Sequence, residues 1–132
     1  MERPAKILLI DDDPDFVQAT KKVLESKPYE VIVAYNGEEG LQKARDEKPD
    51  LILLDIIMPL TDGFTVCEEL KSNPEFADIP VLMITSFSQR VGETTLAVSR
   101  GFYLEAEDYI DKPIKPAELL ARIEKQLRKK RK

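Results

Sequence analysis

Histidine does not occur in this 132-residue sequence. Because histidine is the usual general base near neutral pH and the commonest zinc ligand, its absence argues against both kinds of site. The single cysteine, Cys67, excludes an intrachain disulfide and fits a reducing compartment, so we interpret it as structural. The five glycines are scattered and form no Gly-x-x-x-x-Gly-Lys loop, which excludes ATP chemistry of that kind.

Apolar stretches of membrane-spanning length are also missing, and Met1-Glu2-Arg3-Pro4 lacks the layout of a signal peptide. Acidic residues outnumber basic ones by 25 to 20, and the formal net charge is -5. A chain of this charge is not a nucleic-acid binder by electrostatics. We therefore expect a soluble, cytoplasmic protein with no membrane contact and no direct nucleic-acid binding.

The length of 132 residues and the hydrophobic content of 42% predict a single domain spanning residues 1–132, with its core in 4–127. The basic run Arg128-Lys129-Lys130-Arg131-Lys132 follows that core. We interpret it as a solubilising helix end, or as the start of a linker to a missing output domain. A nucleic-acid or lipid contact is the alternative.

Short apolar runs bounded by turn signals recur along the chain and are typical of strands covered on both faces of a parallel sheet. Polar residues follow the ends of these runs. Because ligands bind outside the carboxyl ends of the strands in open parallel sheets, we expect a site at that edge. The strands are predicted at 6–10, 29–34, 50–54, 81–84 and 108–111, and their ends lead to Asp11, Asp12, Asp55, Thr85 and Lys112.

Helical segments alternate with these strands. Asp13 and Pro14 predict a helix start, with Asp13 as the cap, and Asn36 predicts another. Helices are expected at 14–26, from 37 to the residue before Pro49, at 64–72 and from Pro116 into the basic tail, with a short or irregular helix within 86–107. The alternation predicts a flavodoxin-like α/β fold: a doubly wound, five-stranded parallel sheet in the order 2-1-3-4-5 with helices on both faces.

The carboxylates of Asp11, Asp12 and Asp55 would repel one another at a shared edge. They must be partly protonated or surround a hard cation, and oxygen-only ligands favour magnesium (Mg2+). A carboxylate beside such a cation can attack a phosphoryl group. Asp55 is placed for that attack, and Lys112 and Thr85 are placed for the phosphoryl oxygens.

These residues, in this order and spacing, resemble the receiver domain of two-component response regulators of the chemotaxis-regulator type over nearly the whole chain. The motifs are Asp11-Asp12, Asp55 within Asp-Ile-Ile-Met-Pro-Leu-Thr-Asp-Gly, Thr85, and Tyr109-Ile110-Asp111-Lys112-Pro113. The chain departs from the family in two ways. The stretch from Thr85 to Lys112 is longer than usual, and Leu104-Glu105-Ala106-Glu107 replaces the small Gly-Ala motif before the last strand.

The resemblance implies roles for individual residues. Asp55 is the phospho-acceptor and, with Asp11 and Asp12, a magnesium ligand. The backbone carbonyl of Ile57 completes the protein's share of the metal site. Lys112 bridges Asp55 and the phosphoryl group. Thr85 and Tyr109 form the switch pair.

The implied function is a signalling switch and not an enzyme. A sensor histidine kinase or phosphotransfer protein supplies the phosphoryl group. The phosphorylated form then changes its binding to an output protein or missing output domain, or forms a homodimer. The resemblance also implies autophosphorylation from small phosphodonors and autodephosphorylation.

Two other functions remain open at this point. An aspartate-dependent magnesium phosphohydrolase also uses a strand-end aspartate, but it needs an acid two residues further on, where this chain has Ile57. The second alternative is a receiver-like docking module that accepts no phosphate. The complete set of site residues argues against this alternative.

Overall fold

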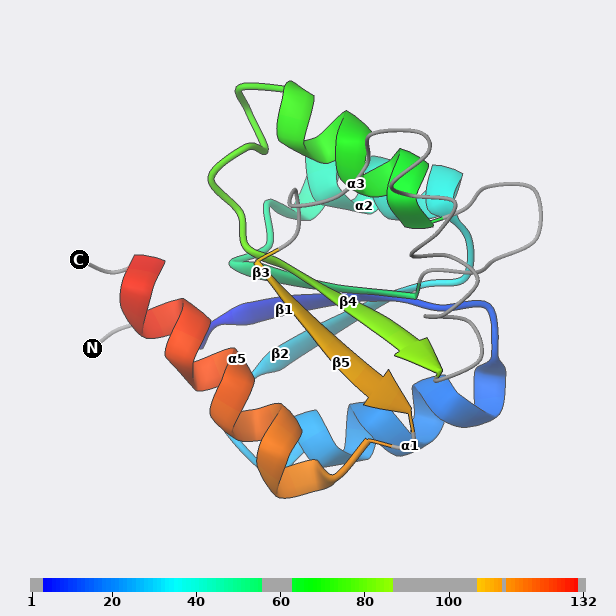
Figure 1. Cartoon of the computed structure of the whole chain (residues 1–132), viewed down its shortest axis with the longest axis vertical. Coiled ribbons are helices and arrows are strands. Elements are labelled where there is room, and N and C mark those ends of the chain that lie inside the picture. The colour runs from blue at the N-terminus through cyan, green and yellow to red at the C-terminus, as the bar shows by residue number, and fades with distance from the viewer. Residues whose placement is uncertain (1–3, 56–62, 87–106, 113, 131–132) are drawn as a thin grey trace.

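The computed structural model of this chain describes residues 4–55, 63–86, 107–112 and 114–130. Helices and strands alternate within them (Figure 1). The elements are β1 (Lys6–Ile10), α1 (Pro14–Glu25), β2 (Glu30–Ala34), α2 (Gly37–Glu47), β3 (Leu51–Asp55), α3 (Gly63–Ser72), β4 (Val81–Ser86), β5 (Asp108–Lys112) and α5 (Pro116–Lys130). Their boundaries differ from the predicted ones by only one or two residues. The irregular helix predicted within 86–107 lies in a segment outside the described residues.

The five strands form one sheet in the order β2-β1-β3-β4-β5, and all of its pairings are parallel. The predicted doubly wound topology is therefore confirmed. Asp55 pairs with Ile84, and Ser86 pairs with Lys112. The carboxyl ends of β3, β4 and β5 consequently meet at one edge of the sheet.

Helices cover both faces of the sheet. In Figure 1, α2 and α3 lie above the sheet, and α1 and α5 lie below it. Each helix pair encloses its own group of buried side chains. The α2/α3 cluster contains Leu8, Ile10, Ala34, Ala44, Ile52, Leu54, Val66, Cys67, Leu70, Phe76, Ile79, Val81 and Met83. The α1/α5 cluster contains Ala5, Ile7, Leu9, Val17, Leu24, Leu51, Leu53, Leu82, Ile84, Ile110, Leu119, Ile123 and Leu127.

Successive residues of the central strands alternate between the two clusters, as side chains along a strand must. Ile10 and Leu54 belong to the α2/α3 cluster. The residues that follow them, Asp11 and Asp55, therefore point toward the α1/α5 side. Every residue of β3 is buried, which explains why its sequence is a continuous apolar run and does not alternate.

The start of α1 is organised by Asp13. Its side chain accepts hydrogen bonds from the backbone N–H groups of Asp15 and Phe16, at 3.0 and 3.3 Å. Pro14 occupies the first turn, where its missing N–H costs nothing. The predicted cap is confirmed, and it places the first turn of α1 directly after the acidic end of β1.

The N-terminus of α2 is capped by two reciprocal hydrogen bonds. Asn36 Oδ1 accepts from the Glu39 N–H at 2.7 Å, and Glu39 Oε1 accepts from the Tyr35 N–H at 2.7 Å. Further along, Gly40 faces β1 so closely that a Cβ there would lie 2.5 Å from Ile10 Cδ1. A glycine at this position therefore lets α2 pack against the sheet.

A largely buried lysine, Lys71, joins α3 to the beginnings of β4 and β5, at the edge opposite the acids. Lys71 Nζ donates to the carbonyl oxygens of Ala77 and Ile79 at 3.2 and 2.9 Å, and to Glu107 Oε2 at 2.9 Å. Glu107 Oε1 accepts from the Val81 N–H at 2.8 Å. We call this set the Lys71–Glu107 clasp. Glu107 belongs to the tetrapeptide Leu104-Glu105-Ala106-Glu107, noted above as a departure from the family that the sequence resembles.

Helix α5 packs one stripe of side chains against the sheet. Leu119, Ile123 and Leu127 belong to the α1/α5 cluster, whereas Glu124 and Arg128 are exposed. Among the described residues, no helix combines the length and the apolarity that a membrane crossing requires.

Candidate functional site

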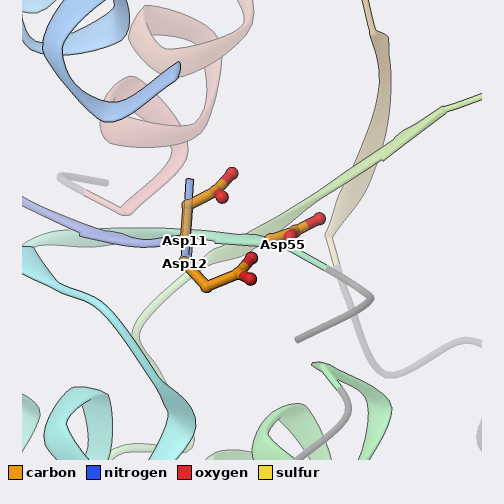
Figure 2. Close-up of side chains that lie close together, drawn as sticks. All are labelled: Asp11, Asp12 and Asp55. Carbon is orange, nitrogen blue, oxygen red and sulfur yellow. The ribbon is translucent and has the colours of Figure 1, made fainter. Parts of the chain in front are cut away.

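Three acids from two strand ends converge at the carboxyl edge of the sheet. Asp11 and Asp12 follow β1, and Asp55 is the last residue of β3 (Figure 2). Each offers a carboxylate oxygen, and these oxygens all lie within 4.8 Å of one another. Asp11 is fully buried, Asp55 is 3% exposed, and Asp12 faces solvent. The structure thus brings together the three acids that the sequence analysis selected.

The Asp11 carboxylate is fully buried and makes one hydrogen bond to the start of the next helix. Its Oδ1 accepts a hydrogen bond from the Asp13 N–H at 3.0 Å, and its Oδ2 accepts none from the described residues. Burial raises the pKa of the Asp11 carboxyl above the ordinary 3.8, although the Asp13 N–H and the Lys112 ammonium oppose the shift. A nearby cation would favour the charged form of this side chain.

Lys112, at the end of β5, supplies a cation to this cluster. Its Nζ lies 3.5 Å from Asp11 Oδ2 and 3.9 Å from Asp55 Oδ1, and its side chain is 24% exposed. The family resemblance implied that Lys112 bridges Asp55 and the phosphoryl group, but the ammonium lies nearer to Asp11 than to Asp55. One ammonium is therefore shared between two buried carboxylates.

Sequence reasoning missed one neighbour of this ammonium. The ring centroid of Phe16, in the first turn of α1, lies 4.2 Å from Lys112 Nζ. The available signal was its position, three residues after the cap Asp13 and directly behind the acidic cluster. That position alone does not indicate a contact with the end of β5.

The remaining predicted site residues are Thr85, Tyr109 and Ile57. Thr85 lies in β4, where its backbone pairs with Asp111 in β5, and its side chain is not among those described. Tyr109 pairs with Met83, and its half-buried side chain packs against the α2/α3 cluster. Ile57 lies outside the described residues. The roles of Thr85 and Tyr109 as a switch pair therefore stay predictions.

The donor set of the acid cluster fits magnesium. All three groups are carboxylates, which are the hard oxygen ligands that this ion prefers. The buried Oδ2 of Asp11 forms no hydrogen bond with the described residues and has the Lys112 ammonium 3.5 Å away, so a metal ion bound beside it would stabilise its charge further. Three acids beside one ammonium also leave an excess of negative charge. Asp11, Asp12 and Asp55 are the described residues that would hold the ion.

Comparison with known proteins identifies the family. Residues 7–124 match the family model of the response regulator receiver domain. The "DNA-binding dual master transcriptional regulator RpaA" of Synechocystis sp. is 41% identical, over 94% of this chain and 49% of its own length. The "Alkaline phosphatase synthesis transcriptional regulatory protein PhoP" of Bacillus subtilis is 40% identical over the same shares. The chain thus spans about half the length of the curated relatives it matches.

Solved structures agree with this result. A putative response regulator from Chloroflexus aurantiacus has a TM-score of 0.82 and 34% identity, covering 94% of this chain and 98% of that chain. A CheY-like receiver domain protein from Methanospirillum hungatei has a TM-score of 0.82 and 30% identity, covering 97% of both chains. The chain belongs to the response regulator receiver domains, the signalling switches of two-component systems.

Proposed function

We propose that Asp55 is the residue of this receiver domain that accepts the phosphoryl group. One observation carries the proposal: Asp55 is nearly buried at the end of a central strand, with Lys112 Nζ 3.9 Å away and the carboxylates of Asp11 and Asp12 beside it. Open parallel sheets bind ligands at this edge. An anionic nucleophile, a cation and further metal-binding groups are the parts that phosphoryl transfer requires.

In the proposed reaction, a carboxylate oxygen of Asp55 attacks the phosphorus of a phosphohistidine. The new oxygen–phosphorus bond forms as the phosphorus–nitrogen bond breaks, and the electron pair returns to the imidazole of the donor protein. The Lys112 ammonium opposes the negative charge that collects on the phosphoryl oxygens. Its position between Asp11 and Asp55 keeps it within reach of both the nucleophile and the incoming group.

Receiver domains generally use Mg2+, and the acid cluster of this chain fits that ion. Asp11, Asp12 and Asp55 would hold it, with the carbonyl of Ile57 as a further ligand by resemblance to the family. When bound, the ion neutralises charge on the phosphoryl group. Thr85 is the proposed hydroxyl contact of that group, again by resemblance. Small acyl phosphates would serve as alternative donors, and the phosphoprotein would hydrolyse itself.

The partners follow from the family and from the share of the relatives that the chain covers. A receiver domain implies a partner that donates the phosphoryl group, either a histidine kinase or a phosphotransfer protein. It also implies an output domain or output protein that responds to the phosphorylated form. We propose that residues 1–132 act as one cytoplasmic receiver unit, and that phosphorylation changes its contact with that output or with a second copy. The formal net charge of -5 supports an output other than direct nucleic-acid binding by this unit.

The test is the intact mass of the protein after incubation with acetyl phosphate and magnesium. The wild type should gain one phosphoryl group, whereas Asp55→Asn and a sample with excess chelator should gain none. Asp46→Asn is the matched control, because Asp46 is an exposed carboxylate on α2 and should label normally. Normal labelling of Asp55→Asn would place the acceptor elsewhere. A wild type that never labels would instead indicate a docking module without phosphoryl chemistry.

A further inference from the structure

The Lys112 ammonium has an aromatic neighbour as well as its two carboxylates. Its Nζ lies 4.2 Å from the ring centroid of Phe16, within the range of a cation–π interaction. The Lys112 side chain is 24% exposed, so water competes only in part for the ammonium. The ring carries no charge. It can therefore attract the ammonium without repelling an incoming anionic group as a third carboxylate would.

Phe16 is tied to the acid cluster through a short chain of hydrogen bonds. Asp11 Oδ1 accepts from the Asp13 N–H at 3.0 Å, and Asp13 Oδ1 accepts from the Phe16 N–H at 3.3 Å. The cap that starts α1 thus also sets where Phe16 lies relative to Asp11. The half-buried Phe16 side chain packs against the α1/α5 cluster, which restricts its motion further.

Lys112 also borders a largely apolar cavity of about 510 Å³ between α1 and the segment that leads into α5. Phe16 and Lys112 both line it. The other lining residues are Ala19, Thr20, Val23, Ile114, Pro116 and Leu119. None of these carries a charge. Among the described residues that line this cavity, Phe16 is the one whose ring lies close enough to attract the Lys112 ammonium.

We propose that Phe16 is a positioning residue, whose ring holds the Lys112 ammonium at the acid cluster while a phosphoryl group reaches Asp55. The proposal rests on the proposed role of Asp55 as acceptor. The two carboxylates that contact Lys112 are also the groups that would bind the metal or form the new bond. A neutral aromatic ring keeps the ammonium in place while those carboxylates bind the metal or react with the phosphoryl group.

The contact itself can be tested without any phosphorylation. In the wild type, the ring current of Phe16 should shift the ε-methylene proton resonances of Lys112 upfield in the NMR spectrum, with the assignment made from Lys112→Met. Phe16→Leu keeps an apolar side chain and should abolish the shift, whereas Phe16→Tyr should keep it. Val23→Ala is the matched control, because Val23 lines the same cavity but has no aromatic ring to interact with Lys112. An unchanged resonance in Phe16→Leu overturns the proposal.

The functional test is the rate of Asp55 phosphorylation by acetyl phosphate at saturating magnesium. Phe16→Leu should be roughly 2- to 10-fold slower, the size expected for loss of a partly exposed cation–π contact, and Phe16→Tyr should remain near the wild-type rate. Replacing Phe16 by phenylalanines with one, two and three ring fluorines should lower the rate stepwise, because fluorination weakens the ring's attraction for a cation at nearly constant size.

The outcomes separate the two proposals. A flat rate across the fluorinated series, or an equal loss in Val23→Ala and Phe16→Leu, would show that Phe16 contributes only packing, while Asp55 remained the acceptor. A wild type that takes up no phosphoryl group would reject the role of Asp55, and the positioning role of Phe16 would fall with it.

Discussion

Lys112 Nζ lies 3.5 Å from Oδ2 of Asp11, a side chain that is fully buried. Asp55 Oδ1 is also close to this ammonium, at 3.9 Å. A single positive charge cannot neutralise both carboxylates, and the exposed acid Asp12 lies beside them. The edge of the sheet therefore carries a local excess of negative charge, although its strands are packed in an apolar core. This imbalance underlies the electrostatic predictions below.

The first prediction concerns pH. Burial raises the pKa of the Asp11 carboxyl above 3.8, so the folded protein binds this proton more tightly than the unfolded chain does. The contribution of Asp11 to stability is therefore most favourable at low pH, and it is lost as the pH rises from 3.8 through the raised value. Without magnesium, Asp11→Asn should stabilise the protein at pH 7, and this gain should shrink toward pH 4.

Urea unfolding of both proteins at several pH values in the presence of chelator would measure this difference. Asp46→Asn, which changes an exposed carboxylate, should show little pH-dependent difference from the wild type. A loss of stability in Asp11→Asn at pH 7 would mean that the ionised carboxylate is well compensated by its neighbours.

The second prediction concerns metal binding. An ion that binds only the folded state stabilises it by about 2.7 kcal/mol at a concentration 100 times its Kd, so millimolar magnesium should raise the Tm. Asp12→Ala should raise the Tm of the metal-free protein, because it removes a repelling charge, and should reduce the magnesium-dependent increase. A thermal scan that shows no magnesium response in the wild type would contradict the proposed ligand set.

The third prediction concerns the Lys71–Glu107 clasp. The Lys71 side chain is only 9% exposed and satisfies two carbonyl oxygens together with Glu107. Lys71→Met should lower the free energy of unfolding by about 1–3 kcal/mol, because the carbonyl oxygens of Ala77 and Ile79 lose their donor. Glu47→Gln, which alters the more exposed ion pair with Lys6, should cost less than about 1 kcal/mol. Equal losses of unfolding free energy in Lys71→Met and Glu47→Gln, measured in urea, would show that the Lys71–Glu107 clasp contributes no more than an exposed ion pair.

The fourth prediction concerns signal output. The half-buried Tyr109 packs against the α2/α3 cluster, and we expect phosphorylation to move its ring through a contact between Thr85 and the new phosphoryl group. A fluorine label on the tyrosine ring should report a new environment after phosphorylation. Thr85→Ala should keep the phosphorylation but lose most of this change. Coupling of the usual size, ~1–3 kcal/mol, would favour the active arrangement by about 5- to 150-fold.

Hydrogen exchange of the backbone amides, compared between the phosphorylated and unphosphorylated protein, would show which elements change. Changes on phosphorylation should appear in β5 and α5. Changes confined to α1 and α2 would mean that the signal leaves the site by another face.

The sequence by itself was enough to determine the elements and the edge at which the site lies. Apolar runs identify buried strands, and the caps Asp13 and Asn36 identify helix starts, because burial and capping depend mainly on residues that are near one another in the chain. The acids Asp11, Asp12 and Asp55 could be grouped because parallel strands place their carboxyl ends at one edge. Lys112 was selected for the same reason, because it stands at the end of the last strand.

Contacts between elements distant in sequence were decided only by the tertiary structure. The approach of Lys112 to Asp11, the ring of Phe16 over that ammonium and the Lys71–Glu107 clasp each join side chains from different layers or strands. These side-chain contacts depend on how the helices pack against the sheet. The pattern of residues along the chain does not specify the distances between side chains of different elements.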